Sequence, residues 1–153
     1  MKKNKAKVQG IAKGRVLYLV ETSHYMGTPK MHEWVVTSIM RPPRRGTNRY
    51  YPLPKAEKRV YLKFENEWGT DRSHFELSDW PGQFSATKRA AWKQALKTLR
   101  RRIAQYEQEL TETLDMKKDD EFYEHRLEIV ADIKKALKTL RTGLTKVSKK
   151  IKA

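Results

Sequence analysis

The chain has 153 residues, which suits one or two small units and excludes a large multidomain enzyme. Lys and Arg number 34 against 18 Asp and Glu, so the net charge of +16 predicts an anionic partner, most often nucleic acid. The alternatives are anionic membranes, acidic proteins, or a charge that only keeps a helical protein in solution. The absence of cysteine excludes disulfides, cysteine zinc sites and cysteine nucleophiles.

The N-terminal residues 1–14 are basic, and we expect them to form a flexible arm. The first apolar run, from Val16 to Val20, is too short for an export signal or a membrane span. We therefore expect a soluble, cytoplasmic protein with no membrane partner.

Four runs rich in branched and aromatic residues predict a small β-rich module over residues 15–81. They are Arg15–Val20, Met31–Met40, Arg59–Phe64 and a short fourth run, His74–Leu77. Because these strands precede the predicted helices, the order indicates an α+β fold with an antiparallel sheet.

The segment that joins the second and third runs is the first candidate nucleic-acid site. Its residues 41–51 contain four Arg, two Tyr and no acid. Guanidinium groups pair with phosphate oxygens and Tyr rings stack on unpaired bases, although the tyrosines could instead pack on the sheet. The candidate residues are Arg41, Arg44, Arg45, Arg49, Tyr50 and Tyr51.

Residues 85–151 predict a long antiparallel two-helix hairpin that resembles a coiled coil. The chain has no Gly or Pro from Ser85 to Gly143, and we expect Ser85 to be the N-cap. Helices at about 86–115 and 120–150 are joined by a short polar segment, which favours antiparallel packing. One apolar seam comprises Trp92, Leu96, Leu99, Ile103, Tyr106, Leu110 and Leu114; the other comprises Tyr123, Leu127, Val130, Ile133, Leu137, Leu140, Leu144, Val147 and Ile151.

Charge is segregated along these helices. Residues 85–106 contain seven cations and no acid, residues 107–132 contain ten acids and three cations, and residues 133–153 contain eight cations and no acid. Antiparallel packing would bring the two cationic blocks together and leave the acids at the turn. The nucleic-acid candidates are Lys88, Arg89, Lys93, Lys97, Arg100, Arg101, Lys146, Lys149 and Lys150, and the predicted protein-docking tip is Asp115, Asp119, Asp120 and Glu121.

Catalytic motifs are missing from the sequence. No glycine-rich phosphate loop is present, and the nearest catalytic groupings, His32-Glu33 and residues 71–74, lack metal-ligand spacing. The carboxylates of residues 107–132 are expected on outward helix faces, without the convergence that a metal requires. We therefore expect no enzyme activity, cofactor, metal or small-molecule substrate.

Two functions fit these features. The first is a non-enzymatic protein that binds DNA or RNA through the cationic blocks and the Arg41–Tyr51 segment. The second is an adaptor or inhibitor that binds a host nucleic-acid enzyme or nucleoprotein complex. Small basic factors of that kind are encoded by viruses and mobile elements, for example against host defence, and would act in the host cytoplasm. The sequence leaves the oligomeric state open.

Overall fold

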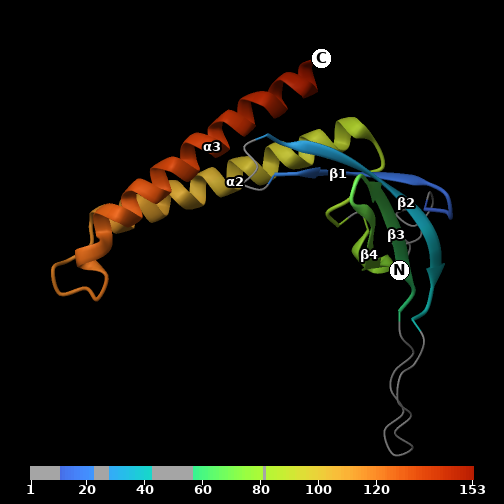
Figure 1. Cartoon of the computed structure of the whole chain (residues 1–153), viewed down its shortest axis with the longest axis horizontal. Helices are drawn as coiled ribbons and strands as arrows, with labels where there is room; N and C mark the ends of the chain where they lie inside the picture. The colour runs from blue at the N-terminus through green and yellow to red at the C-terminus, as the bar shows by residue number, and fades with distance from the viewer. Residues whose placement is uncertain (1–10, 23–27, 43–56, 81) are drawn as a thin grey trace, which may run out of the picture. The chain divides into compact units, whose positions relative to one another are not determined.

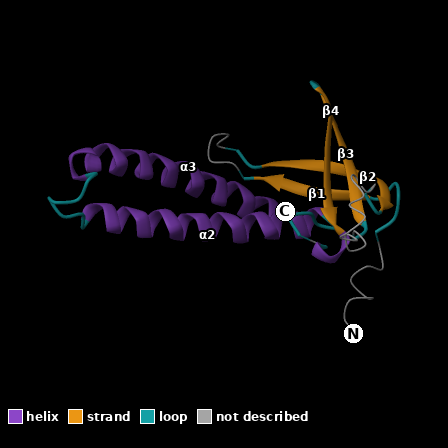
Figure 2. Cartoon of the chain, turned by 90° about the horizontal axis from the view of Figure 1, so that it is seen from below, coloured by secondary structure: helices purple, strands orange, loops and turns teal. Residues whose placement is uncertain are grey.

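The computed structural model describes residues 11–22, 28–42, 57–80 and 82–153. Over these residues the chain forms a four-stranded antiparallel sheet followed by two long helices (Figures 1 and 2), which confirms the predicted α+β class. The elements are β1 (Val16–Glu21), β2 (Lys30–Met40), β3 (Arg59–Asn66), β4 (Gly69–Glu76), η1 (Leu77–Asp79), α2 (Lys88–Leu114), η2 (Tyr123–His125) and α3 (Arg126–Lys152).

The sheet has the strand order β1-β2-β3-β4. The fourth strand is longer than predicted because Asn66 pairs with Gly69 and closes a tight turn. Gly69 has a φ of 136°, which a side chain would disfavour, and Asn66 Oδ1 accepts a 2.8 Å hydrogen bond from Trp68 N. Trp68, at this turn, is 90% exposed.

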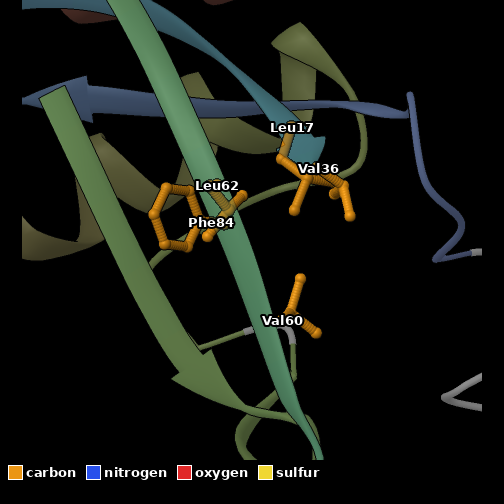
Figure 3. Close-up of a cluster of buried hydrophobic side chains, with 5 residues drawn as sticks. All are labelled: Leu17, Val36, Val60, Leu62 and Phe84. Carbon is orange, nitrogen blue, oxygen red and sulfur yellow. The ribbon is translucent and has the colours of Figure 1, made fainter. Parts of the chain in front are cut away.

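Five buried side chains form the core of the sheet unit: Leu17, Val36, Val60, Leu62 and Phe84 (Figure 3). Each strand from β1 to β3 supplies at least one of them, and Phe84 comes from the segment before α2. The same segment pairs with β1, because Ser85 and Tyr18 exchange two backbone hydrogen bonds of 2.9 Å.

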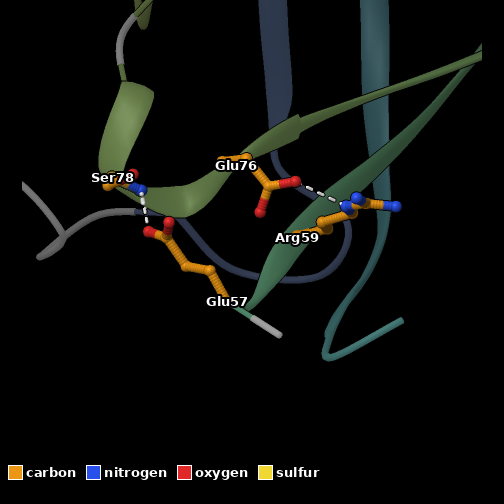
Figure 4. Close-up of polar contacts among 4 residues, drawn as sticks. All are labelled: Glu57, Arg59, Glu76 and Ser78. Carbon is orange, nitrogen blue, oxygen red and sulfur yellow. Dashed lines mark hydrogen bonds and ion pairs between the residues drawn. The ribbon is translucent and has the colours of Figure 1, made fainter. Parts of the chain in front are cut away.

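Polar contacts fix the end of the sheet where β3 begins (Figure 4). Arg59 Nε donates a 2.6 Å hydrogen bond to Glu76 Oε1, and this contact raises the pKa of Arg59 above its ordinary value. Glu57 Oε1 accepts a 2.8 Å hydrogen bond from Ser78 N. Together the two carboxylates join β4 and η1 to the start of β3.

Both helices begin later than the sequence predicts. Ser85 is not an N-cap, because its backbone pairs with Tyr18 and α2 begins only at Lys88. The second helix begins at Arg126 and not near 120, because Asp120 Oδ1 accepts a 3.0 Å hydrogen bond from Phe122 N and stabilises a turn there.

The buried faces of the helices agree only in part with the predicted seams. In α3, Val130, Ile133, Leu137, Leu140 and Val147 are buried as expected. In α2 the buried residues near the start are small: Ala91 and Ala95 are buried, whereas Trp92 and Leu96 are half-buried. Two seam residues near the turn, Leu114 and Leu127, are exposed.

The chain divides into two compact units. One contains residues 1–19 and 32–88, and the other contains residues 20–31 and 89–153. Two described residues between β1 and β2 contact the helices of the second unit: Arg102 Nη1 donates a 2.6 Å hydrogen bond to Thr22 O, and Lys146 Nζ lies 2.9 Å from Thr28 Oγ1. Within the described ranges, neither helix combines the length and apolar character needed to cross a membrane.

Candidate nucleic-acid interface

Four exposed cations follow one another along α2 at intervals of four residues. They are Arg89, Lys93, Lys97 and Arg101, which we call the α2 cationic row. Arg89, Lys93 and Lys97 each lie two positions before a buried residue of α2, and two positions rotate a helix by about 200°. The row therefore faces away from the packed side of the helix.

The row carries uncompensated charge. No acidic residue occurs in α2 before Glu107, and among the described residues no carboxylate lies within ion-pair distance of the four cations. Arg100 is also exposed and adds a fifth cation beside the row. A surface of this kind offers phosphates both positive charge and bidentate guanidinium contacts.

Two of the predicted binding cations already have partners. Lys88 Nζ lies 3.1 Å from Glu33 Oε1, and this hydrogen bond raises the pKa of Lys88 above its ordinary value. The same Nζ lies 5.8 Å from the ring centre of Tyr18. Lys146 Nζ is engaged by Thr28 Oγ1. A phosphate would compete with these contacts at Lys88 and Lys146, but not in the α2 cationic row.

The other predicted cations divide into exposed and undescribed residues. Arg41, Lys149 and Lys150 are exposed. The remaining candidates of the Arg41–Tyr51 segment lie outside the described residues: Arg44, Arg45, Arg49, Tyr50 and Tyr51.

Sequence reasoning missed a group of cations on α3. Lys134, Lys138 and Arg141 line an open groove of about 570 Å³ together with Leu110 of α2. Their spacing of four and three residues was visible in the sequence. Only the packing of α3 beside α2 shows that these cations border a groove.

All four residues of the predicted protein-docking tip are exposed: Asp115, Asp119, Asp120 and Glu121. Three large apolar side chains close to them in sequence are exposed as well: Leu114 at 60%, Phe122 at 55% and Leu127 at 71%. Exposed apolar groups of this size often mark interaction surfaces.

The residues considered for catalysis make ordinary packing contacts. The His32 ring lies 4.7 Å from that of Phe64, and the His74 ring lies 5.9 Å from that of Tyr61. Asp71 Oδ2 accepts a 2.8 Å hydrogen bond from Asn66 Nδ2. In the part of the chain that the structure describes, no three His, Asp or Glu residues converge as metal ligands would.

The chain was compared with protein-family models, curated proteins and solved structures, and none of the three comparisons gives a match.

Proposed function

We propose that the chain is a non-enzymatic nucleic-acid-binding protein whose helical unit holds phosphates through the α2 cationic row. The observation that carries the proposal is the row itself, because four exposed cations, with no acidic partner among the described residues, face away from the buried side of α2. A helix that only required solubility would gain stability by alternating its charges. Segregated cations lower that stability and favour a polyanion.

The proposal includes an antiparallel, coiled-coil-like hairpin formed by α2 and α3. Three observations support this arrangement. Both views show the helices side by side (Figures 1 and 2). Glu107 of α2 pairs with Arg141 of α3, and Gly143, further along α3, faces Leu99, which lies earlier in α2. The contacts move toward the C-terminus of α3 as they move toward the N-terminus of α2, which supports helices that run in opposite directions.

In this hairpin the C-terminal cations Lys149 and Lys150 would lie beside the first half of α2 and extend the basic surface. Phosphate contacts of this kind hold a strand in position but carry little sequence information. We therefore expect affinity for DNA or RNA with weak sequence preference and strong salt dependence.

A triple variant tests the proposal: Lys93→Gln, Lys97→Gln and Arg101→Gln. The matched control removes the same charge elsewhere in the helical unit through Lys117→Gln, Lys118→Gln and Lys135→Gln. Fluorescence anisotropy with a labelled 20-base-pair duplex should show that the row variant binds at least about tenfold more weakly. Its log–log salt slope should be shallower by about 0.9 for each phosphate that the variant no longer neutralises. Equal affinities of the two variants would refute the role of the row.

An adaptor that binds a protein is the second candidate, and one observation favours it. Leu114, Phe122 and Leu127 are exposed beside the acidic residues of the turn, which suits a basic partner with apolar anchors. Affinity purification with and without nuclease separates the two functions. A stoichiometric protein partner that survives nuclease treatment would favour the adaptor, whereas co-purifying nucleic acid alone favours the first proposal.

A further inference from the structure

The groove beside α3, which we call the α3 groove, combines positive charge with an apolar floor. Leu110 of α2 is half-buried and Leu137 of α3 is buried, and both line the groove. Lys134, Lys138 and Arg141 line it from α3 and are all exposed. The methylene stems of such cations add apolar surface while their charged ends reach solvent. The α3 groove therefore offers two kinds of contact within one small volume.

The three cations stand on one face of α3. Their spacing of four and three residues keeps them in register on the helix surface, over a length of about 10 Å. Each follows directly after a buried residue, Ile133, Leu137 or Leu140, so the cations lie along the edge of the packed seam. This placement differs from that of the α2 cationic row, which faces away from the buried side.

The charges of the α3 groove are only partly compensated. Arg141 Nη2 lies 2.9 Å from Glu107 Oε1, which orients the guanidinium and offsets its charge. Among the described residues, no carboxylate lies within ion-pair distance of Lys134 or Lys138. An anion entering the groove would therefore meet these two lysines first.

The two threonines that line the α3 groove do not compete with the lysines for an anion. The Oγ1 atoms of Thr142 and Thr145 donate to the backbone oxygens of Lys138 and Arg141, at 2.9 and 3.1 Å. With their hydrogens engaged, these hydroxyls have no donor left for an anion. Anion binding in the groove would therefore depend on the cations.

We propose that the α3 groove binds an unpaired segment of a nucleic-acid strand, with phosphate at Lys134 and Lys138 and with sugar or base against Leu110. The inference rests on the proposed function and adds a preference to it. A volume of about 570 Å³ lies within the usual range of pockets for small ligands, which suits one or two nucleotides. In a duplex the base faces are stacked on one another, so only an unpaired strand offers apolar base surface together with phosphate.

The test compares two double variants that lose the same charge from the same helix. Lys134→Ala with Lys138→Ala removes the groove lysines, and Lys135→Ala with Lys152→Ala is the control, because neither residue lines the groove. Binding of a labelled 12-nucleotide single strand and of the corresponding duplex is measured at several salt concentrations. The groove variant should bind the single strand about tenfold more weakly than the control does. Its salt slope should be shallower by about 1.4, because two phosphates of the single strand are no longer neutralised.

The outcomes separate the inference from the proposed function. Suppose the wild-type chain binds both probes. If the groove variant then binds the single strand as tightly as the control does, or loses as much affinity for the duplex as for the single strand, the inference is wrong and the proposed function stands. If the wild-type chain binds neither probe, both fail. Thermal melting of each variant provides the folding check, and Thr142→Glu offers a second route, since it should weaken single-strand binding without removing a lysine.

Discussion

Glu107 Oε1 and Arg141 Nη2 lie 2.9 Å apart, and this ion pair joins α2 to α3 at the edge of the α3 groove. Both side chains are more than half exposed, so the pair contributes at most about 1 kcal/mol to stability. Its larger effect is on charge, because Glu107 offsets a cation that would otherwise be free to bind phosphate.

The first prediction concerns the charge of Arg141, which Glu107 offsets. Glu107→Gln should tighten single-strand binding several-fold, because it releases Arg141 as well as raising the net charge. Glu109→Gln changes the net charge equally, but no ion pair to Glu109 is present among the described residues. Anisotropy titrations at one salt concentration compare the two. Equal affinities would show that only net charge matters at this position.

The second prediction separates two adjacent arginines of α2. Arg101 belongs to the α2 cationic row, whereas Arg102 is half-buried and donates a 2.6 Å hydrogen bond to Thr22 O. Arg102→Ala should lower the free energy of unfolding by about 1.5 to 3 kcal/mol, as expected for a hydrogen bond from a charged donor. Arg101→Ala should change it by less than about 0.5 kcal/mol while weakening nucleic-acid binding. Urea denaturation and anisotropy measure the two effects, and the reverse pattern would contradict these assignments.

The third prediction concerns the buried glycine of α3. A Cβ atom at Gly143 would lie 3.5 Å from Pro29 Cγ and 3.8 Å from Leu99 Cδ1, which are ordinary contacts. Gly143→Ala should therefore stabilise the helical unit by about 0.5 to 1 kcal/mol through its higher helix propensity. Thermal melting should show a higher midpoint. A lower midpoint would mean that the space beside Pro29 is smaller than the structure shows.

The fourth prediction compares two aromatic residues of the sheet unit. Phe84 is buried in the core and Trp68 is 90% exposed. Phe84→Ala should cost about 3 to 5 kcal/mol, because it leaves a cavity. Trp68→Ala should leave the free energy of unfolding within about 0.5 kcal/mol of the wild type. A large drop in stability in the Trp68 variant would contradict its exposed position.

Branched and aromatic runs in the sequence predicted all four strands, because a half-buried sheet needs such residues. The fourth strand was predicted too short, because β4 begins with Gly69, Thr70 and Asp71, whose propensities are weak or mixed. Pairing with β3 overrides those propensities.

The helices show the limits of the same reasoning. Large apolar residues marked most buried positions of α3, although Leu127 of the predicted seam is exposed. In α2 the buried positions near the start belong to Ala91 and Ala95, which a search for large side chains passes over. The sequence alone could not distinguish the roles of Arg101 and Arg102. The difference depends on the contact between Arg102 and Thr22, which lie eighty residues apart. The α3 groove was missed for the same reason, since it requires Leu110 beside α3.

The salt dependence of nucleic-acid binding by the wild-type chain tests the central claim most directly. If the exposed cations of the helical unit hold phosphates, the logarithm of the association constant should fall linearly with the logarithm of salt concentration. Four contacts to a B-form duplex would give a slope of about −3.6, and four contacts to a single strand about −2.8. Absence of binding to duplex DNA, single strands and structured RNA at low salt, or an affinity that does not change with salt, would contradict the claim.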